Sequence, residues 1–265
     1  MLLIVAKIHK LESKSIDFVL AFPQADLDVP IYMELPSGVT PIDEPDSNSR
    51  KYVLSLNNNL YGLKQGGFNW FEKLRAGIIN RGFIQSQVNK CVFFRDGCIV
   101  LTYVDDCIIV GKEMAIVDSV IQSLRGGKEE FELTDEGSID KYLGVMIQDI
   151  DESSFKMSQP FLIRQIVEFL SLDVDKTRSR DTPVGKPLLN KDLDGSPRKH
   201  QWVYQGAVEM ISYLCNSVRP EIQMAVHQTA RFSVNPMRSH ELAIIRIGRY
   251  LAANPDRGMV YNIQK

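Results

Sequence analysis

Two adjacent carboxylates, Asp105 and Asp106, lie between two β-branched apolar runs in the segment 99–111. Burying a carboxylate costs roughly several kcal/mol unless a cation compensates its charge. The runs have the composition of strands, so we predict a tight hairpin that holds both carboxylates at a sheet edge. Acidic sites with only oxygen ligands suit hard divalent cations such as Mg²⁺. The alternative is a surface turn, because aspartate is common in turns.

A third acid, Asp17, lies in the apolar run 15–22, where a lone carboxylate needs a cation nearby. If its strand lies beside the predicted hairpin, three carboxylates converge on one sheet edge. Such a site can hold two divalent ions, which activate one oxygen and stabilise a leaving pyrophosphate. The alternative is that Asp17 pairs with a lysine or an arginine, and Lys14 is close in sequence.

The composition is that of a globular protein: 265 residues, 44% of them hydrophobic, can form one large domain or two modest ones. The apolar runs are too short to span a bilayer, and no signal peptide is recognisable. We therefore expect an intracellular protein, in a cytoplasmic particle or the nucleus, that is not secreted and has no transmembrane segment. The apolar start, residues 1–6, predicts the interior of a helix or strand and thus a fragment of a longer chain.

The net charge and the cysteines exclude fewer classes of function than the three aspartates do. The net charge of −2 argues against binding to nucleic acid by bulk charge, although a local basic face stays open. The four cysteines show no zinc-ligand spacing, and we expect reduced thiols that act as small apolar side chains.

The hydrophobic pattern predicts a mixed α/β body followed by a helical tail, an α+β arrangement. Strands are expected at 15–22, 31–35, 91–94, 98–103, 142–147 and 155–157. Helices are expected within 57–82 and at 112–124, 158–170, 205–216, 220–232 and 240–253. Polar, proline-containing stretches predict a loop at 40–50 and a linker at 172–204.

Five groups of residues occur in order along nearly the whole chain. They are Ile16–Phe22 with Ile31–Gly38, Asn59–Gln65 with Trp70–Leu74, Tyr103–Asp106, Lys141–Ile147, and Gln205–Val208 with Tyr213–Leu214, Arg219–Ile222 and Arg249–Leu251. In this order they resemble five parts of the reverse transcriptases of copia-type LTR retrotransposons. These parts are the first catalytic block, the substrate helix, the catalytic hairpin, the primer grip and the helical segment before RNase H.

The resemblance implies a right-hand polymerase palm, a ferredoxin-like antiparallel sheet with helices on one face, followed by a helical thumb or connection segment. The palm with the catalytic aspartates is expected at 1–128, and the primer-grip hairpin with its following helix at 129–171. The polar linker is expected at 172–204 and the thumb or connection segment at 205–265.

The implied activity is that of an RNA-directed DNA polymerase, which adds nucleotides to a primer 3′-hydroxyl with two Mg²⁺ ions, or with Mn²⁺ as a substitute. The implied partners are an RNA or DNA template-primer and deoxynucleoside triphosphates, with no membrane. One alternative is a truncated, inactive retroelement remnant that at most binds nucleic acid. A metal-dependent phosphodiesterase is weaker, because no histidine or glutamate that activates a nucleophile accompanies the acids.

The resemblance also assigns residues to the reaction. Asp17, Asp105 and Asp106 are then the catalytic metal ligands, the last in a supporting role. The backbone carbonyl of Phe18 is a further ligand. Phe22 falls at the steric gate, where its ring would exclude a 2′-hydroxyl and favour deoxynucleotides. Core packing is the alternative for this ring.

Further residues are assigned to nucleotide and primer. Tyr61 and Gly62 would lie under the incoming base and sugar, and Lys64 would meet phosphate unless it is an ordinary solvated lysine. The primer grip would be Tyr142, Leu143 and Gly144, which on sequence alone are an ordinary strand. Arg246 and Arg249 would contact duplex phosphates. The alternative is that they form an ordinary solvated helix face.

The chain departs from the family pattern in several places. After Gln65 the family normally continues with Ala-Pro-Arg or a close variant, whereas here Gly66-Gly67-Phe68 loosens the predicted helix start and lacks the arginine. The segment 134–136 has no lysine to protonate pyrophosphate, so the general acid is unassigned and Lys141 is a weak substitute. The basic fingers upstream of the first block, the RNase H, the integrase and the protease are expected to be missing. We therefore expect the isolated chain to polymerise poorly.

Overall fold

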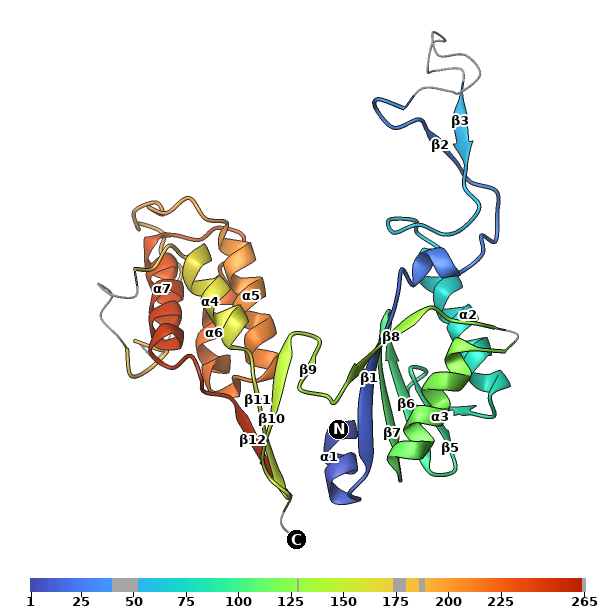
Figure 1. Cartoon of the computed structure of the whole chain (residues 1–265). Helices are drawn as coiled ribbons and strands as arrows, with labels where there is room; N and C mark the ends of the chain where they lie inside the picture. Colours follow the sequence, from blue (N-terminus) through green and yellow to red (C-terminus); the bar gives the residue numbers. More distant parts are fainter. Residues whose placement is uncertain (40–51, 128, 174–179, 186–188, 264–265) are drawn as a thin grey trace. The chain divides into compact units, whose positions relative to one another are not determined.

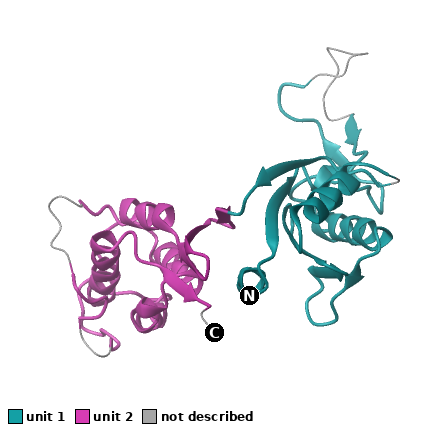
Figure 2. Cartoon of the chain, turned by 60° about the horizontal axis from the view of Figure 1, so that its bottom comes forward, with its two compact units in different colours: residues 1–139 teal, residues 140–265 magenta. Residues whose placement is uncertain are grey.

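The computed structural model describes residues 1–39, 52–127, 129–173, 180–185 and 189–263. The loop expected at 40–50 and parts of the segment 172–204 lie outside these residues. The chain forms two compact units, residues 1–139 and 140–265 (Figure 2). Within the described residues, no helix is long and apolar enough to cross a membrane.

An antiparallel sheet with the strand order β4-β5-β6-β7-β1-β8 forms the centre of the first unit (Figure 1). Its strands are β1 (Glu12–Phe18), β4 (Ile84–Gln85), β5 (Val92–Arg95), β6 (Cys98–Tyr103), β7 (Asp106–Gly111) and β8 (Leu133–Gly137). A second, two-stranded sheet pairs β2 (Tyr32–Glu34) with β3 (Val53–Ser55). The helices are α1 (Leu2–Ile8), the 3-10 helix η1 (Phe22–Gln24), α2 (Gly66–Asn80) and α3 (Met114–Arg125).

Helices α2 and α3 pack on the same face of the six-stranded sheet. Their apolar residues recur at three- and four-residue steps, which gives each helix one apolar side to turn toward the sheet. These residues meet Ile16 and Phe18 of β1 in one apolar core. Since strand side chains alternate between faces, Asp17 points away from this core. The helical members of the core are Trp70, Leu74, Ile78, Val117, Val120, Ile121 and Leu124.

The second unit combines a sheet with strand order β12-β11-β10-β9 and a group of helices. The strands are β9 (Lys141–Tyr142), β10 (Val145–Asp151), β11 (Ser154–Ser158) and β12 (Met259–Asn262). The helices are α4 (Pro160–Phe169), α5 (Tyr204–Ser217), the 3-10 helix η3 (Pro220–Ile222), α6 (Gln223–Ala230) and α7 (Arg238–Ala253). A separate core joins the apolar faces of α4 to α7.

The described parts of the polar segment 172–204 are bound to these helices. Leu172, Val184 and Trp202 pack against the second core. The fully buried carboxylate of Glu241 on α7 accepts hydrogen bonds from the backbone N–H groups of Lys199 and His200. A buried carboxylate needs such donors, so this contact fixes the end of the segment to α7.

The structure confirms the predicted α+β arrangement with antiparallel sheets, but several local predictions were wrong. The strand expected at 15–22 ends at Phe18, and Leu20 has a left-handed backbone with φ of 49°. The helix expected within 57–82 is found at Gly66–Asn80, inside that range. Strands β8 and β12 were not predicted, because each is short, partly polar and pairs with a strand distant in sequence.

The guanidinium of Arg81, at the end of α2, ties the two helices of the first unit together. It donates hydrogen bonds to four backbone carbonyls, at 2.7 to 2.8 Å. These carbonyls belong to Gly77, Ser123, Gly126 and Glu129. A single side chain thus satisfies carbonyls at the ends of both α2 and α3 that have no partner within their helices.

Replacing Arg81 with alanine is expected to lower the free energy of unfolding of the first unit by about 3 kcal/mol, because buried carbonyls lose a charged donor. Urea unfolding followed by fluorescence measures the change in a Trp202→Phe background, where Trp70 is the only tryptophan. Arg75→Ala is the matched control, since this side chain only pairs with Glu72 on the surface of α2 and should matter little. Equal stability of the two variants would contradict the expectation.

Candidate active site

The pairing of β1 with β7, two inner strands of the sheet, brings the three predicted aspartates together at one end of these strands. Asp17 lies directly opposite Asp106 in the antiparallel register. Opposite residues in such a pair have Cβ atoms roughly 5 Å apart and side chains on the same face. The backbone N–H of Phe18 donates to the carbonyl of Asp105 at 2.9 Å, which fixes the hairpin turn against the end of β1. All three aspartates are half-buried.

Lys14, which the sequence suggested as a partner of Asp17, pairs with other acids. The Lys14 ammonium lies 2.8 Å from a carboxylate oxygen of Asp118 and 3.0 Å from one of Asp135, so these two acids bind the lysine. The pKa of Asp17 is raised, first by desolvation and then by the negative charges of Asp105 and Glu136. The site therefore gathers like charges in a partly desolvated place, which a bound cation would relieve.

The turn between β6 and β7 holds a strained residue. Val104 has a φ of 56°, a left-handed conformation that is unfavourable for a β-branched side chain. Its carbonyl accepts a hydrogen bond from the indole Nε1 of Trp70 at 2.6 Å. Trp70 is buried and packs edge-to-face on Phe18 and Phe131. The core beneath the sheet thus holds the turn that carries Asp105.

The acids do not form a closed set of metal ligands by themselves. Among the described residues, no group of three histidine, cysteine, aspartate or glutamate side chains is placed to hold a metal ion. Mg²⁺ commonly binds through one or two carboxylates and completes its shell with water and substrate phosphates. Two half-buried aspartates with only oxygen donors, Asp17 and Asp105, fit an ion held in this way.

The residues assigned to the nucleotide lie in two adjoining loops of the first unit, the one after β1, which contains the short helix η1, and the one before α2. The rings of Phe22 and Tyr61 stack with centroids 4.6 Å apart and planes 21° apart. The Asn59 side chain joins the loops by donating to the carbonyls of Ala25 at 3.0 Å and Asp26 at 2.7 Å. Gly62 has a φ of +97° with open space where a side chain would lie.

Lys64 is exposed, and its assigned contact with phosphate stays a prediction. The loop with Phe22 has a second attachment in Gln24. Its side-chain amide donates to the carbonyls of Val19 and Glu132 and accepts from the N–H of Glu132. The amide thereby acts like a strand peptide and holds the loop to the start of β8.

The residues assigned to the primer grip belong to the second unit. Leu143 and Gly144 form the left-handed turn between β9 and β10, with φ of 48° and 74°. The Leu143 carbonyl accepts a hydrogen bond from the Tyr213 hydroxyl at 2.7 Å, which attaches the turn to α5. Tyr142 precedes this turn in β9. Their role at a primer end stays a prediction.

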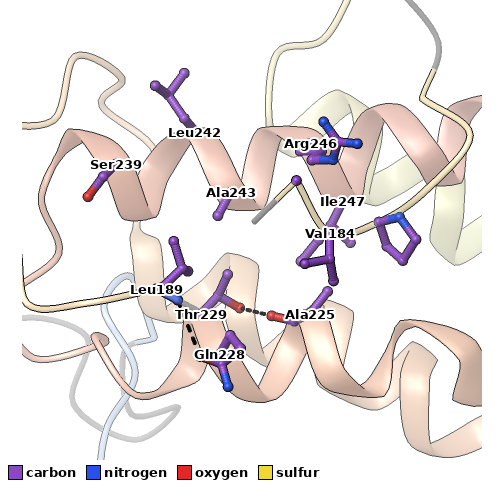
Figure 3. Close-up of a pocket in the computed structure, with 12 residues that line it drawn as sticks. Val184, Leu189, Ala225, Gln228, Thr229, Ser239, Leu242, Ala243, Arg246 and Ile247 are labelled. Atoms are coloured by element: carbon purple, nitrogen blue, oxygen red, sulfur yellow. Dashed lines mark hydrogen bonds between the residues drawn. The ribbon is translucent and has the colours of Figure 1, made fainter. Parts of the chain in front are cut away.

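Arg246 and Arg249, assigned to phosphate contacts, lie on α7 and are half-buried. The Arg246 guanidinium donates to the carbonyl of Thr182 at 3.1 Å and to its hydroxyl at 2.9 Å. It also borders a cavity of about 290 Å³ between α6 and α7 (Figure 3). In this arrangement Arg246 holds the segment at Thr182, and contact of either arginine with nucleic acid stays a prediction.

Sequence reasoning missed the residues that hold the site in place. Trp70 was recognised through helical periodicity and the block Trp70–Leu74, neither of which shows its contact with the turn, and Gln24 gave no signal at all. Asn59 lies in a recognised block, but nothing in the sequence shows that its amide joins two loops. Their functions depend on contacts between residues far apart in the chain, such as Trp70 with Val104, and local patterns do not report such contacts.

Residues 1–185 match the family described as reverse transcriptase (RNA-dependent DNA polymerase). Over 253 residues the chain is 28% identical to the retrovirus-related Pol polyprotein from transposon TNT 1-94 of Nicotiana tabacum, covering 91% of this chain and 18% of that protein. The Pol polyprotein from transposon RE1 of Arabidopsis thaliana is 29% identical over 251 residues, which cover 93% of this chain and 16% of that protein. A putative transposon Ty5-1 protein of Saccharomyces cerevisiae is 29% identical over 239 residues, which cover 87% of this chain and 73% of that protein.

The chain belongs to the reverse transcriptase family, since the matched residues make up more than half of it. The similarity to Pol polyproteins of transposons confirms the resemblance to the copia type. The chain spans only 18% and 16% of the length of the TNT 1-94 and RE1 polyproteins.

Replacing Trp70 with phenylalanine is expected to loosen the turn at Val104, because ring packing is kept while the donor to the carbonyl is lost. NMR relaxation of backbone amides should show new motion confined to residues 103–106. Phe131→Leu is the matched control, since it changes the same aromatic cluster without touching the hydrogen bond. Unchanged relaxation of residues 103–106 in the Trp70→Phe variant would show that the indole does not hold this turn.

The raised pKa of Asp17 predicts a pH-dependent effect on stability. Between the unfolded value of 3.8 and the higher folded value, the folded chain binds more protons than the unfolded chain. The free energy of unfolding therefore falls as pH rises through this window and then levels off. Asp17→Asn removes this contribution. The free energy of unfolding of the variant minus that of the parent should therefore increase as pH rises through the window. Urea unfolding from acid to neutral pH measures this difference, and a constant difference would refute the expectation.

Proposed function

We propose that this chain carries the nucleotidyl-transfer site of a copia-type RNA-directed DNA polymerase. In this proposal the first unit is the palm, and the helices of the second unit are the thumb or connection segment. The observation that carries the proposal is the β1–β7 register, which sets Asp17 opposite Asp106 with Asp105 in the adjoining turn. Family membership supports the proposed class of reaction, and the β1–β7 register supports its proposed location at these aspartates.

Asp17 and Asp105 would hold two Mg²⁺ ions, with Asp106 and the carbonyl of Phe18 in supporting positions. Bound at these residues, Mg²⁺ would activate the primer 3′-hydroxyl as a nucleophile and neutralise charge on the leaving pyrophosphate. The chain's own contribution is positioning: the indole of Trp70 and the N–H of Phe18 hold the turn in one conformation. A preorganised site of this kind needs no rearrangement as charge develops in the transition state.

The stacked rings of Phe22 and Tyr61 would form the surface on which the incoming sugar and base rest, beside the open backbone at Gly62. The partly buried ring of Phe22 would exclude a 2′-hydroxyl by steric contact. Lys64 would contact phosphate from its exposed position. The substrates in this proposal are deoxynucleoside triphosphates and an RNA or DNA template-primer.

A second candidate function is binding of nucleic acid without turnover, as in an inactive remnant. The observation in its favour is Glu136, which adds negative charge near Asp17 close to where many polymerases have a lysine before the glycine. This charge disfavours an anionic leaving group, and no general acid is assigned there. Mn²⁺, which tolerates less ideal ligand geometry, is therefore included as a substitute ion in the test.

Primer extension separates the two functions. With Mg²⁺ or Mn²⁺, the chain should extend a DNA primer on an RNA template, and Asp105→Asn should lower the rate by about a hundredfold or more. Asp96→Asn is the matched control: the same change in the exposed turn between β5 and β6, paired only with Lys112, should leave the rate unchanged. Template binding without extension by the parent chain would favour the inactive remnant.

A further inference from the structure

The ring of Phe22 rests directly on the backbone at the start of α2. A Cβ atom built on Gly66 would lie 3.3 Å from Cδ2 of Phe22 and 3.2 Å from the carbonyl oxygen of Leu60. Both distances are shorter than ordinary van der Waals contact. One built on Gly67 would lie 3.6 Å from Cζ of Phe22, which is an ordinary contact. The ring thus occupies space that is available only because residue 66 has no side chain.

The glycine at position 66 is not required by its backbone. Unlike Gly62, Gly66 does not have a positive φ, and it is the first residue of the helix α2. Glycine is a poor helix former, and alanine is the best. The space filled by the Phe22 ring and by the carbonyl oxygen of Leu60 is therefore the structural feature that distinguishes glycine from alanine here, and of the two the side chain is the part that can move.

The other surroundings of the ring limit where it can move. One face of Phe22 is stacked on Tyr61, and the loop of Tyr61 is fixed by the hydrogen bonds of Asn59. The loop of Phe22 itself is held by Gln24. A methyl group at position 66 would displace the ring by a few tenths of an ångström, and the displacement would be away from α2.

We propose that Gly66 is a specificity-determining residue that sets the depth of Phe22 and thereby the room left for the nucleotide sugar. The inference rests on the proposed function, because it assigns Phe22 to the sugar. With glycine the ring is recessed onto α2 and leaves more space near the 2′ position. Adding a methyl group should advance the ring and strengthen the exclusion of ribonucleotides.

The test compares incorporation of dGTP and GTP by the full chain on poly(rC) primed with oligo(dG). Gly66→Ala should raise the ratio of kcat/KM for dGTP over GTP by about three- to tenfold. Gly67→Ala is the matched control, with the same exchange one residue along the helix, and should leave the ratio unchanged. In a Phe22→Val background, Gly66→Ala should no longer alter the ratio, because the effect acts through the ring.

Binding provides a readout that does not need turnover. Competition of dGTP and GTP against a fluorescent deoxynucleotide gives the ratio of their affinities, which should shift in the same direction in Gly66→Ala. If the parent extends primers but both ratios are unchanged in Gly66→Ala, the inference fails while the proposed function stands. If the parent binds nucleotides selectively without extending primers, a shifted binding ratio supports the inference and the polymerase proposal fails. A Gly66→Ala chain that does not fold, or a parent that binds neither nucleotide, overturns the inference.

Discussion

The first unit depends on one constraint, the pairing of β1 with β7 that places acidic side chains together at the end of the sheet. Like charges in a partly desolvated place oppose folding, and Asp17 shows this in its raised pKa. The compensation comes from the other face of the same strands, where Phe18 packs with Trp70 and Phe131. The apolar core therefore stabilises an arrangement that the acids by themselves would disfavour.

Unfavourable backbone conformations near the site are likewise held by the surrounding structure. A left-handed valine at position 104 is unfavourable, and it is held by a hydrogen bond from the side chain of a buried tryptophan. The loop after β1 contains a second left-handed residue, Leu20, close to the amide of Gln24 that fixes this loop to β8. Both strained positions flank residues assigned to the reaction. Strain of this kind persists only where the surrounding structure determines the conformation fully.

The sequence was sufficient for the α+β class, for most helices and for the proximity of the three aspartates, because these follow from periodicity and from ordered blocks of residues. It was not sufficient for the strand β8, whose polar residues Thr134 to Glu136 give no hydrophobic signal. It suggested Lys14 as a partner of Asp17, whereas strand alternation directs Lys14 to Asp118 and Asp135. The two glycines at 66 and 67 suggested a weak helix start, and only the structure shows an aromatic ring packed against them.

The strand β12 has a consequence for how the second unit forms. It pairs with β11 so that Ser154 meets Asn262, which joins residues more than a hundred positions apart. Contacts of such long sequence separation close late in folding, because the entropy of the intervening loop must be lost first. Until β12 is synthesised, the outer edge of β11 has no strand to pair with and can template association with other chains. Pairing then moves this open edge from β11 to β12, which is only four residues long, and short edge strands limit such association.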